Sequence, residues 1–148
     1  MSTYTQIYVQ TVFSVYNREP LLNKNWRDRL YNYIIAIINN HKHNVLAIGG
    51  TEDHIHIFFC HNQNQTIPDL MRQVKRDSSI WIKNENLIKC RFAWQEGYGA
   101  FSYSKSQADI IIEYIRNQEK HHLIKSSYDE YVQLLDAFGI EYEKKYVL

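Results

Sequence analysis

Two short segments of strand-like composition lie close together near the middle of the chain, and they constrain the fold more than any other feature. Asn44–Ile48 and His54–Cys60 are rich in β-branched, aromatic and other apolar residues, and Gly49 and Gly50 lie in the short stretch between them. Strands joined by so short a connection pair in antiparallel orientation, because a parallel pair needs a crossover of about a dozen residues or more. The sequence therefore predicts a β-hairpin, and with it an antiparallel sheet.

Further strand and helix patterns flank this hairpin. Gln6–Tyr16 alternates and is rich in Val, Ile, Tyr, Phe and Thr, which is typical of a strand, and Gly99–Tyr103 is a short candidate for another. Between the first strand and the hairpin, Trp26–His41 carries a helical stripe of apolar residues, namely Leu30, Ile34, Ile37 and Ile38. After the hairpin, Thr66 is suited to cap a second helix that has Pro68 in its first turn.

Two more helices are expected near the C-terminus. One runs from Ser104 or Ser106 to about His121, and the other covers Ser127–Phe138, with Gly139 as its stop signal. Without the last helix, the order is strand, helix, strand, strand, helix, strand, helix. This order predicts an α+β fold of the ferredoxin-like or RRM-like kind, an antiparallel sheet with helices packed on one face. Such folds host many activities, so the fold alone does not indicate a function.

The length of 148 residues predicts one domain over 1–148, with the last helix and a tail at about 127–148. The first residues lack the basic and apolar segments of a signal peptide. The longest apolar run, Ile34–Ile38, is far shorter than the ~20 residues of a membrane span. Cys60 and Cys90 form no disulfide pattern, which favours a reducing compartment. We therefore expect a cytoplasmic protein that is not associated with a membrane.

Positive charge is concentrated in one part of a chain whose net charge is only +1. Between Arg72 and Arg91 the acids are Asp77 and Glu85, against six basic residues: Arg72, Lys75, Arg76, Lys83, Lys89 and Arg91. A basic segment of this kind is typical of nucleic-acid contacts, but a solvated helix face shows the same pattern. The charge pattern alone leaves both interpretations open.

Asp53-His54-Ile55-His56-Ile57 is the segment that points most directly to chemistry. Side chains alternate between the faces of a strand, so His54 and His56 are expected to point to one side and Ile55 and Ile57 to the other. Two imidazoles on one face can bind a single divalent cation, and imidazole suits Mn, Fe, Co, Ni and Zn. Two histidines can also alternate on a solvated strand without a ligand, so a metal site requires a third donor from elsewhere.

Tyr114 and Gln118 are candidates for the rest of such a site. They are four residues apart on the expected helix and therefore lie on one face of it. The amide oxygen of Gln118 could complete the coordination of a metal, and the phenol of Tyr114 could act as a nucleophile. A free phenol has a pKa near 10, so it needs help to lose its proton at neutral pH. Most of the 12 tyrosines must be structural, with Tyr98 and Tyr103 the main competitors for a catalytic role.

Taken together, three segments resemble the IS200/IS605-type transposases, the single-tyrosine (Y1) members of the HUH nuclease superfamily. These segments are Gly49-Gly-Thr-Glu-Asp-His-Ile-His56, Trp94-Gln-Glu-Gly-Tyr-Gly-Ala-Phe-Ser102 and Tyr114-Ile-Arg-Asn-Gln-Glu-Lys-His-His122. They occur in the family's order and spacing, and the resemblance extends over nearly the whole chain to about His122.

The resemblance implies a DNA transposase that cuts and rejoins single strands through a 5′-phosphotyrosine intermediate. Tyr114 matches the nucleophile, while His54, His56 and Gln118 match the ligands of a divalent metal, Mg or Mn. It further implies recognition of single-stranded DNA with hairpin ends, and a homodimer in which Tyr114 of one subunit works with the histidines of the other. From charge and aromatic character we expect these residues to contact DNA: Arg72, Lys75, Arg76, Lys83, Arg91, Trp94 and Tyr98.

Three alternatives remain at this stage. A domesticated relative could act on dispersed palindromic repeats with the same chemistry, and could be monomeric. A plain metal-dependent hydrolase would cut DNA without any covalent adduct. An RRM-like module would bind single strands without cutting them, by stacking bases on aromatic residues of an exposed sheet face. The last reading conflicts with the sequence, because it places histidines on that face and gives Tyr114 and Gln118 no reason to align.

Overall fold

The computed structural model describes residues 2–122 and 125–147, and its elements follow the predicted order. The strands at His54–Cys60 and Gly99–Tyr103 have the predicted bounds, and Thr66 caps its helix as expected by accepting a hydrogen bond from the Asp69 amide. The strands and helices have these bounds: β1 Tyr8–Ser14, α1 Lys24–Asn40, β2 Asn44–Gly50, β3 His54–Cys60, α2 Ile67–Asn84, β4 Gly99–Tyr103, α3 Ala108–Arg116, α4 Gln118–His121 and α5 Ser127–Ala137.

The four strands form one antiparallel sheet in the order β2-β3-β1-β4. The predicted hairpin is confirmed as β2–β3, and β3 and β1 lie at the centre of the sheet. In the β1–β3 register, Ser14 lies opposite His54 and Val12 lies opposite His56. This is the α+β, ferredoxin-like arrangement that the sequence predicts.

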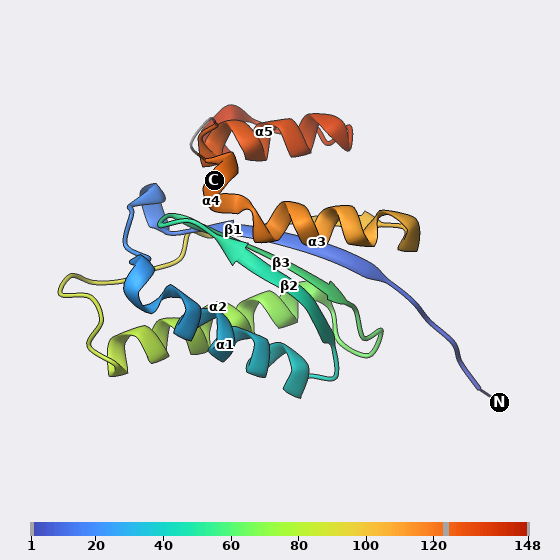
Figure 1. Cartoon of the computed structure of the whole chain (residues 1–148), viewed down its shortest axis with the longest axis horizontal. Helices are drawn as coiled ribbons and strands as arrows, with labels where there is room; N and C mark the ends of the chain where they lie inside the picture. The colour runs from blue at the N-terminus through green and yellow to red at the C-terminus, as the bar shows by residue number, and fades with distance from the viewer. Residues whose placement is uncertain (1, 123–124, 148) are drawn as a thin grey trace.

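The helices α1 and α2 pack side by side on one face of the sheet (Figure 1). Ile55, Ile57 and Phe59 of β3 alternate with the two histidines and are fully buried in the core under these helices. This layer confirms the side-chain alternation on which the interpretation of His54 and His56 depends.

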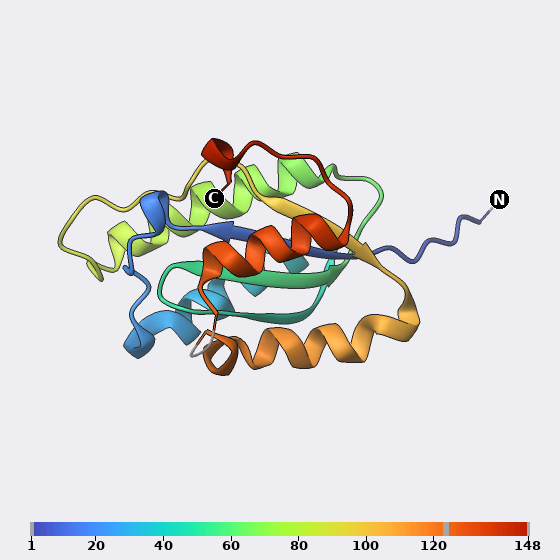
Figure 2. The same cartoon turned by 90° about the horizontal axis from the view of Figure 1, so that it is seen from above.

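The opposite face of the sheet is also covered, by α3 and α5 (Figures 1 and 2). Phe58 packs there with Ile115 of α3, and Phe101 packs with Tyr131 and Leu135 of α5. The expectation that the helices pack on one face is met only by α1 and α2, because α3 and α5 cover the other face. An RRM-like module would need this surface open for bases, so the cover argues against that alternative.

The helix expected to run continuously to about His121 is interrupted at Asn117. Asn117 has φ −100° and ψ 21°, and it ends α3 one residue before α4 begins at Gln118. Asparagine favours such ends because its side chain competes with the helical hydrogen bonds. Tyr114 therefore lies on α3 and Gln118 on α4, although both still face the sheet.

Within the residues that the structure describes, none of the helices is long and apolar enough to cross a membrane.

Candidate active site

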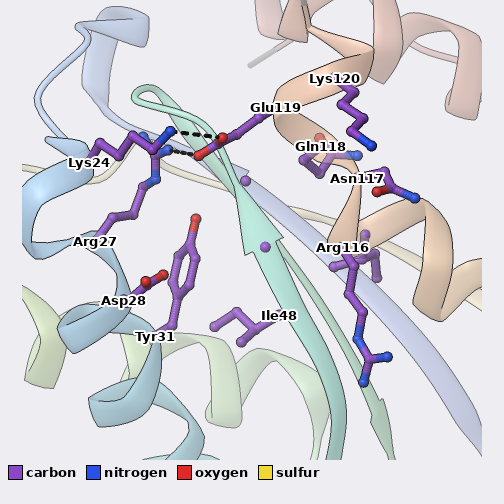
Figure 3. A pocket seen from close by; sticks show the side chains of 13 residues that line it. Lys24, Arg27, Asp28, Tyr31, Ile48, Arg116, Asn117, Gln118, Glu119 and Lys120 are labelled. Atoms are coloured by element: carbon purple, nitrogen blue, oxygen red, sulfur yellow. Dashed lines mark hydrogen bonds and ion pairs between the residues drawn. The ribbon is translucent and has the colours of Figure 1, made fainter.

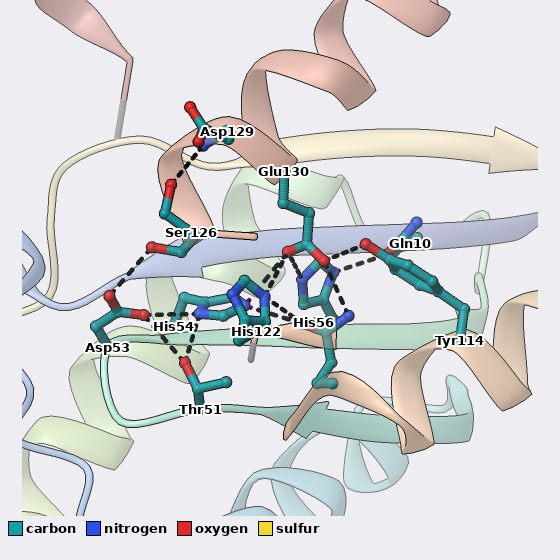
Figure 4. A network of polar contacts seen from close by, with 12 residues as sticks. Gln10, Thr51, Asp53, His54, His56, Tyr114, His122, Ser126, Asp129 and Glu130 are labelled. Carbon is teal, nitrogen blue, oxygen red and sulfur yellow. Dashed lines mark hydrogen bonds and ion pairs between the residues drawn. The ribbon is translucent and has the colours of Figure 1, made fainter. Parts of the chain in front are cut away.

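The two histidines of β3 lie in a closed space between the sheet and the C-terminal helices (Figure 4). His54 is 1% exposed and His56 is completely buried, and their ring centroids are 5.0 Å apart. A solvated pair of histidines is therefore excluded. Buried imidazoles need polar partners, and both rings have them on each side.

The outward nitrogens of both rings are held by residues of the sheet and its hairpin. Nδ1 of His54 lies 2.8 Å from a carboxylate oxygen of Asp53 and 3.0 Å from the hydroxyl of Thr51. Nδ1 of His56 lies 2.8 Å from the side-chain oxygen of Gln10 on β1. Carboxylate and amide oxygens accept hydrogen bonds, so each Nδ1 carries a proton. This arrangement orients each Nε2 toward the interior, as outer partners do around metal-binding histidines.

Five donor atoms converge on the interior side of these rings. His54 Nε2 is 3.0 Å from Gln118 Oε1, and His56 Nε2 is 2.7 Å from Glu130 Oε1. His122 Nε2 lies 3.1 Å from Gln118 Oε1 and 3.2 Å from Glu130 Oε1. Facing donor atoms of His54, His122 and Glu130 all lie within 4.8 Å of one another. Three imidazole nitrogens with a carboxylate and an amide oxygen fit a divalent transition metal such as Mn.

Tyr114 reaches the same group of side chains from α3. Its hydroxyl donates a hydrogen bond to Glu130 Oε2, the oxygen that also accepts from the Gln118 amide at 3.1 Å. The ring stands edge-on to His56 at 5.9 Å and packs against His121 at 4.9 Å. Burial, and then the neighbouring Glu130 carboxylate, raise the pKa of Tyr114 above its ordinary value. The phenol is therefore held in its neutral form with a proton acceptor in contact.

Negative charge in this cluster is carried by Glu130. Burial alone would raise the pKa of its carboxyl, but hydrogen bonds with His122, His54 and His56 hold the pKa far below its usual range. Burial would likewise lower the pKa of His54, whereas its hydrogen bonds to Asp53 and Glu130 raise it to about 9. The site thus contains an ionised, buried carboxylate that favours a cation.

A glycine in β2 lets α3 come close enough to place Tyr114 over the histidines. A Cβ atom at Gly49 would lie 2.3 Å from the carbonyl oxygen of Ile115, which is closer than real contacts allow. Any side chain at this position would push the end of α3 away from the sheet. Gly50 is restricted in the same way by the backbone of His54, so both glycines serve the geometry of the site.

The sequence profile described as "Transposase IS200 like" matches residues 3–118, which is most of the chain. The chain belongs to the IS200-like transposase family. A comparison with curated proteins gave no match.

Two solved structures share the fold of this IS200-like transposase. A candidate transposase from Deinococcus radiodurans R1 has a TM-score of 0.65 and 18% identity, over 80% of this chain and 95% of that one. A REP-associated tyrosine transposase bound to a REP hairpin has a TM-score of 0.61 and 16% identity, over 82% of this chain and 74% of that one.

Two of the residues expected to contact DNA have internal roles instead. Trp94 is only 8% exposed, donates from Nε1 to Ser78 Oγ at 2.9 Å and packs edge-on against Phe13, so it cannot stack on a base. Lys75 donates to the backbone carbonyls of Gln95 and Gly97 and so holds the loop before β4. The sequence predicted DNA contacts for Trp94 and Lys75 from residue type alone, and residue type does not show whether a side chain is buried or already hydrogen-bonded.

The other expected contacts stay predictions. Arg72, Arg76 and Lys83 are exposed on α2, which lies on the face of the sheet away from the histidines. Arg91 is exposed and Tyr98 is half-buried, and both lie in the segment between α2 and β4.

The structure adds residues to the site that sequence reasoning missed. Glu130 is the most important, since it contacts all three histidines and Tyr114, yet no motif marks it within α5. His122 lies at the end of the third family segment, but sequence reasoning assigned it no role. Asp53 and Gln10 hold the histidines from behind, and the position of Asp53 directly before His54 was the one available signal.

Proposed function

We propose that this chain is a metal-dependent transposase that cleaves and rejoins single-stranded DNA through a covalent link to Tyr114. The observation that carries the proposal is the contact between the Tyr114 hydroxyl and Glu130, whose other oxygen faces the three histidines. A potential nucleophile, a proton acceptor and a set of metal donors therefore meet within one buried cluster.

The proposed ligands are His54, His56 and Gln118, with His122 and Glu130 as additional donors from the structure. These residues suit a metal ion because the Nε2 atoms of the histidines point toward the interior and because the Glu130 carboxylate is ionised. A bound Mn or Mg ion would polarise the scissile phosphate and stabilise the charge that develops on it. Mixed nitrogen and oxygen donors favour Mn, since Mg prefers oxygen ligands alone.

Tyr114 would perform the cleavage step. Its oxygen forms a bond to phosphorus as the bond from phosphorus to the 3′ oxygen breaks, which leaves a 5′-phosphotyrosine and a 3′-hydroxyl. Glu130 is placed to accept the phenolic proton, since it already accepts that hydrogen bond. The leaving 3′ oxygen takes up one proton to become the hydroxyl, so the step releases no net proton. In the second step the 3′-hydroxyl of another cut end attacks the phosphotyrosine, releases Tyr114 and reseals the strand. No external energy source is needed, because one phosphoester replaces another.

Hairpin recognition is part of this proposal. The structural relative bound to a REP hairpin supports it, because this chain shares its fold. The exposed basic row of Arg72, Arg76 and Lys83 on α2 offers a surface for the phosphates of a folded DNA end.

The proposed sharing of sites between two subunits stays a prediction. In this structure Tyr114 already lies with the histidines of its own chain, at 5.9 Å from the ring of His56. One chain can therefore bring together the nucleophile and the metal donors. This observation favours a second candidate, a repeat-associated enzyme that acts as a monomer. Mixing Tyr114→Phe protein with His54→Ala protein separates the two, since only a shared site regains cleavage.

A covalent-adduct assay tests the proposed chemistry. Labelled single-stranded DNA from the regions beside the gene is incubated with protein and Mn or Mg and then run on a denaturing gel. We expect a shifted band that requires metal and is lost in Tyr114→Phe and His54→Ala. Tyr146→Phe is the matched control, because Tyr146 is 71% exposed and lies outside the site. Cleavage without any adduct would instead support a plain metal-dependent hydrolase.

A further inference from the structure

A groove of about 410 Å³ runs along the edge strand β2, between α1 and the junction of α3 with α4 (Figure 3). Its lining includes Ile48, Gly49 and Gly50 of β2. A second hollow of about 490 Å³ adjoins it and shares Lys24, Arg27 and Glu119 with it. The two form one path along this side of the molecule.

This path reaches the candidate metal cluster at two points. Gln118 lines the first hollow and His122 lines the second, and their side chains are 3.1 Å apart at the cluster. Thr51, which contacts His54, also lines the second hollow. A strand lying in the path would therefore pass directly beside the proposed ligands.

The charged residues of the first hollow favour phosphate. Four are basic and two are acidic: Lys24, Arg27, Arg116, Lys120, Asp28 and Glu119. Lys24, Arg116 and Lys120 are exposed and come from both walls, so they can follow a strand along its length.

Glu119 holds the position in this groove that a phosphate would take. Its carboxylate lies 2.6 Å from Arg27 and 3.3 Å from Lys24. The Arg27 side chain is only 7% exposed and also donates to the Leu22 carbonyl, so its guanidinium is fixed in place. A fixed guanidinium paired with a half-exposed carboxylate is a preformed anion site whose partner can be displaced.

We propose that this groove holds the single strand that enters the active site, with phosphates on Lys24, Arg116 and Lys120 and with Glu119 displaced from Arg27. The inference rests on the proposed function for its substrate class. It also assigns different DNA segments to two places on the molecule. The groove takes unpaired DNA along the β2 edge of the sheet, beside the cleavage site, while the basic row of α2 lies on the face that α1 and α2 cover.

Binding of labelled oligo-dT, measured by fluorescence anisotropy at several salt concentrations, tests the groove. The variant Lys24→Gln/Arg116→Gln/Lys120→Gln should bind more weakly, and its log–log salt slope should fall by about 2, since each phosphate contact on a single strand contributes about 0.7. The matched control Lys42→Gln/Lys105→Gln/Lys144→Gln removes the same charge at exposed positions outside both hollows and should leave the oligo-dT slope unchanged. Equal losses in both variants would overturn the proposal, because they would reflect overall charge alone.

Glu119→Gln provides a test with the opposite sign. It frees Arg27 and Lys24, so oligo-dT affinity should rise by more than in the control Glu113→Gln, which removes an exposed acid on α3 outside the groove. Equal gains in both variants, or a loss in Glu119→Gln, would contradict the displacement of Glu119.

The binding assays and the adduct assay separate the two levels of the argument. If the wild-type chain forms the adduct but the groove variants bind oligo-dT normally, the groove is wrong and the proposed function stands. If oligo-dT binding depends on the groove but wild-type protein forms no adduct under any condition, the groove stands and the covalent chemistry is wrong.

Discussion

Substitution of Gly49 by alanine should displace Tyr114, although Gly49 is not itself one of the catalytic residues. The added Cβ would lie 2.3 Å from the Ile115 carbonyl oxygen, and real contacts of this kind are not shorter than 3.0 Å. The end of α3 must therefore move by at least the difference, about 0.7 Å, if the strand stays in place. Tyr114 directly precedes Ile115, so the nucleophile moves with it.

The expected effects on stability and on catalysis differ in size. Overpacking of this kind costs about 1–3 kcal/mol of unfolding free energy, or about 2–4 °C in Tm for each kcal/mol. A misplacement near 1 Å can reduce a reaction rate by about 100-fold, because catalysis depends on the alignment of the reacting atoms. The variant should therefore remain folded and form the Tyr114–DNA adduct about 100-fold more slowly.

Thermal unfolding and the rate of adduct formation are measured together for this test. Ile38→Val is the matched control, because Ile38 is a fully buried residue of α1 on the other face of the sheet, and the loss of one methyl costs about 0.5–1.5 kcal/mol. The control should keep its adduct rate. A Gly49→Ala protein with the wild-type adduct rate would refute the reasoning that Gly49 sets the position of Tyr114.

Three further predictions concern single groups. Glu130→Gln removes the charge that faces the histidines and should weaken Mn binding by about 10-fold or more in calorimetry, whereas Asp129→Asn, an exposed neighbour on α5, should not. Trp94→Phe removes the hydrogen bond to Ser78 and should lower the free energy of unfolding, measured in urea, by about 1–3 kcal/mol. The affinity for oligo-dT should not change. A loss of affinity without a loss of stability would show that Trp94 contacts DNA after all. In metal-free protein, burial would lower the pKa of His54, but Asp53 and Glu130 raise it to about 9. The contribution of His54 to the free energy of unfolding is therefore complete below about pH 6.5 and is lost as the pH rises toward 9. His54→Asn should remove this decline in stability, and a wild-type free energy of unfolding that does not change over this pH range would contradict the prediction.

Sequence patterns predicted the sheet side of the site well, because strand alternation is a local property. The pattern of His54–Cys60 placed two imidazoles on one face and apolar residues on the other, and the structure has that alternation. The spacing of Tyr114 and Gln118 likewise places both on the side that faces the sheet, even though the helix is interrupted between them.

Long-range contacts account for what the sequence patterns did not predict. Glu130 follows Tyr114 by 16 residues and His56 by 74, and only the packing of α5 over the sheet brings it to the cluster. The burial of Trp94 depends in the same way on Ser78 and Phe13, which come from other elements. The contacts of Glu130 and Trp94 cannot be recognised from the neighbouring sequence. A glutamate in a helix or a tryptophan in a loop occurs at both exposed and buried positions, and the residues beside it do not distinguish the two.

The central claim, a covalent link between DNA and Tyr114, is tested most directly by peptide mapping. Protein incubated with single-stranded DNA and Mn is digested with protease and nuclease, and the modified peptide is sequenced by mass spectrometry. The account predicts a nucleotide joined through its 5′-phosphate to Tyr114. A nucleotide on another residue, such as Tyr98 or Tyr103, or cleaved DNA with no modified peptide, would contradict it.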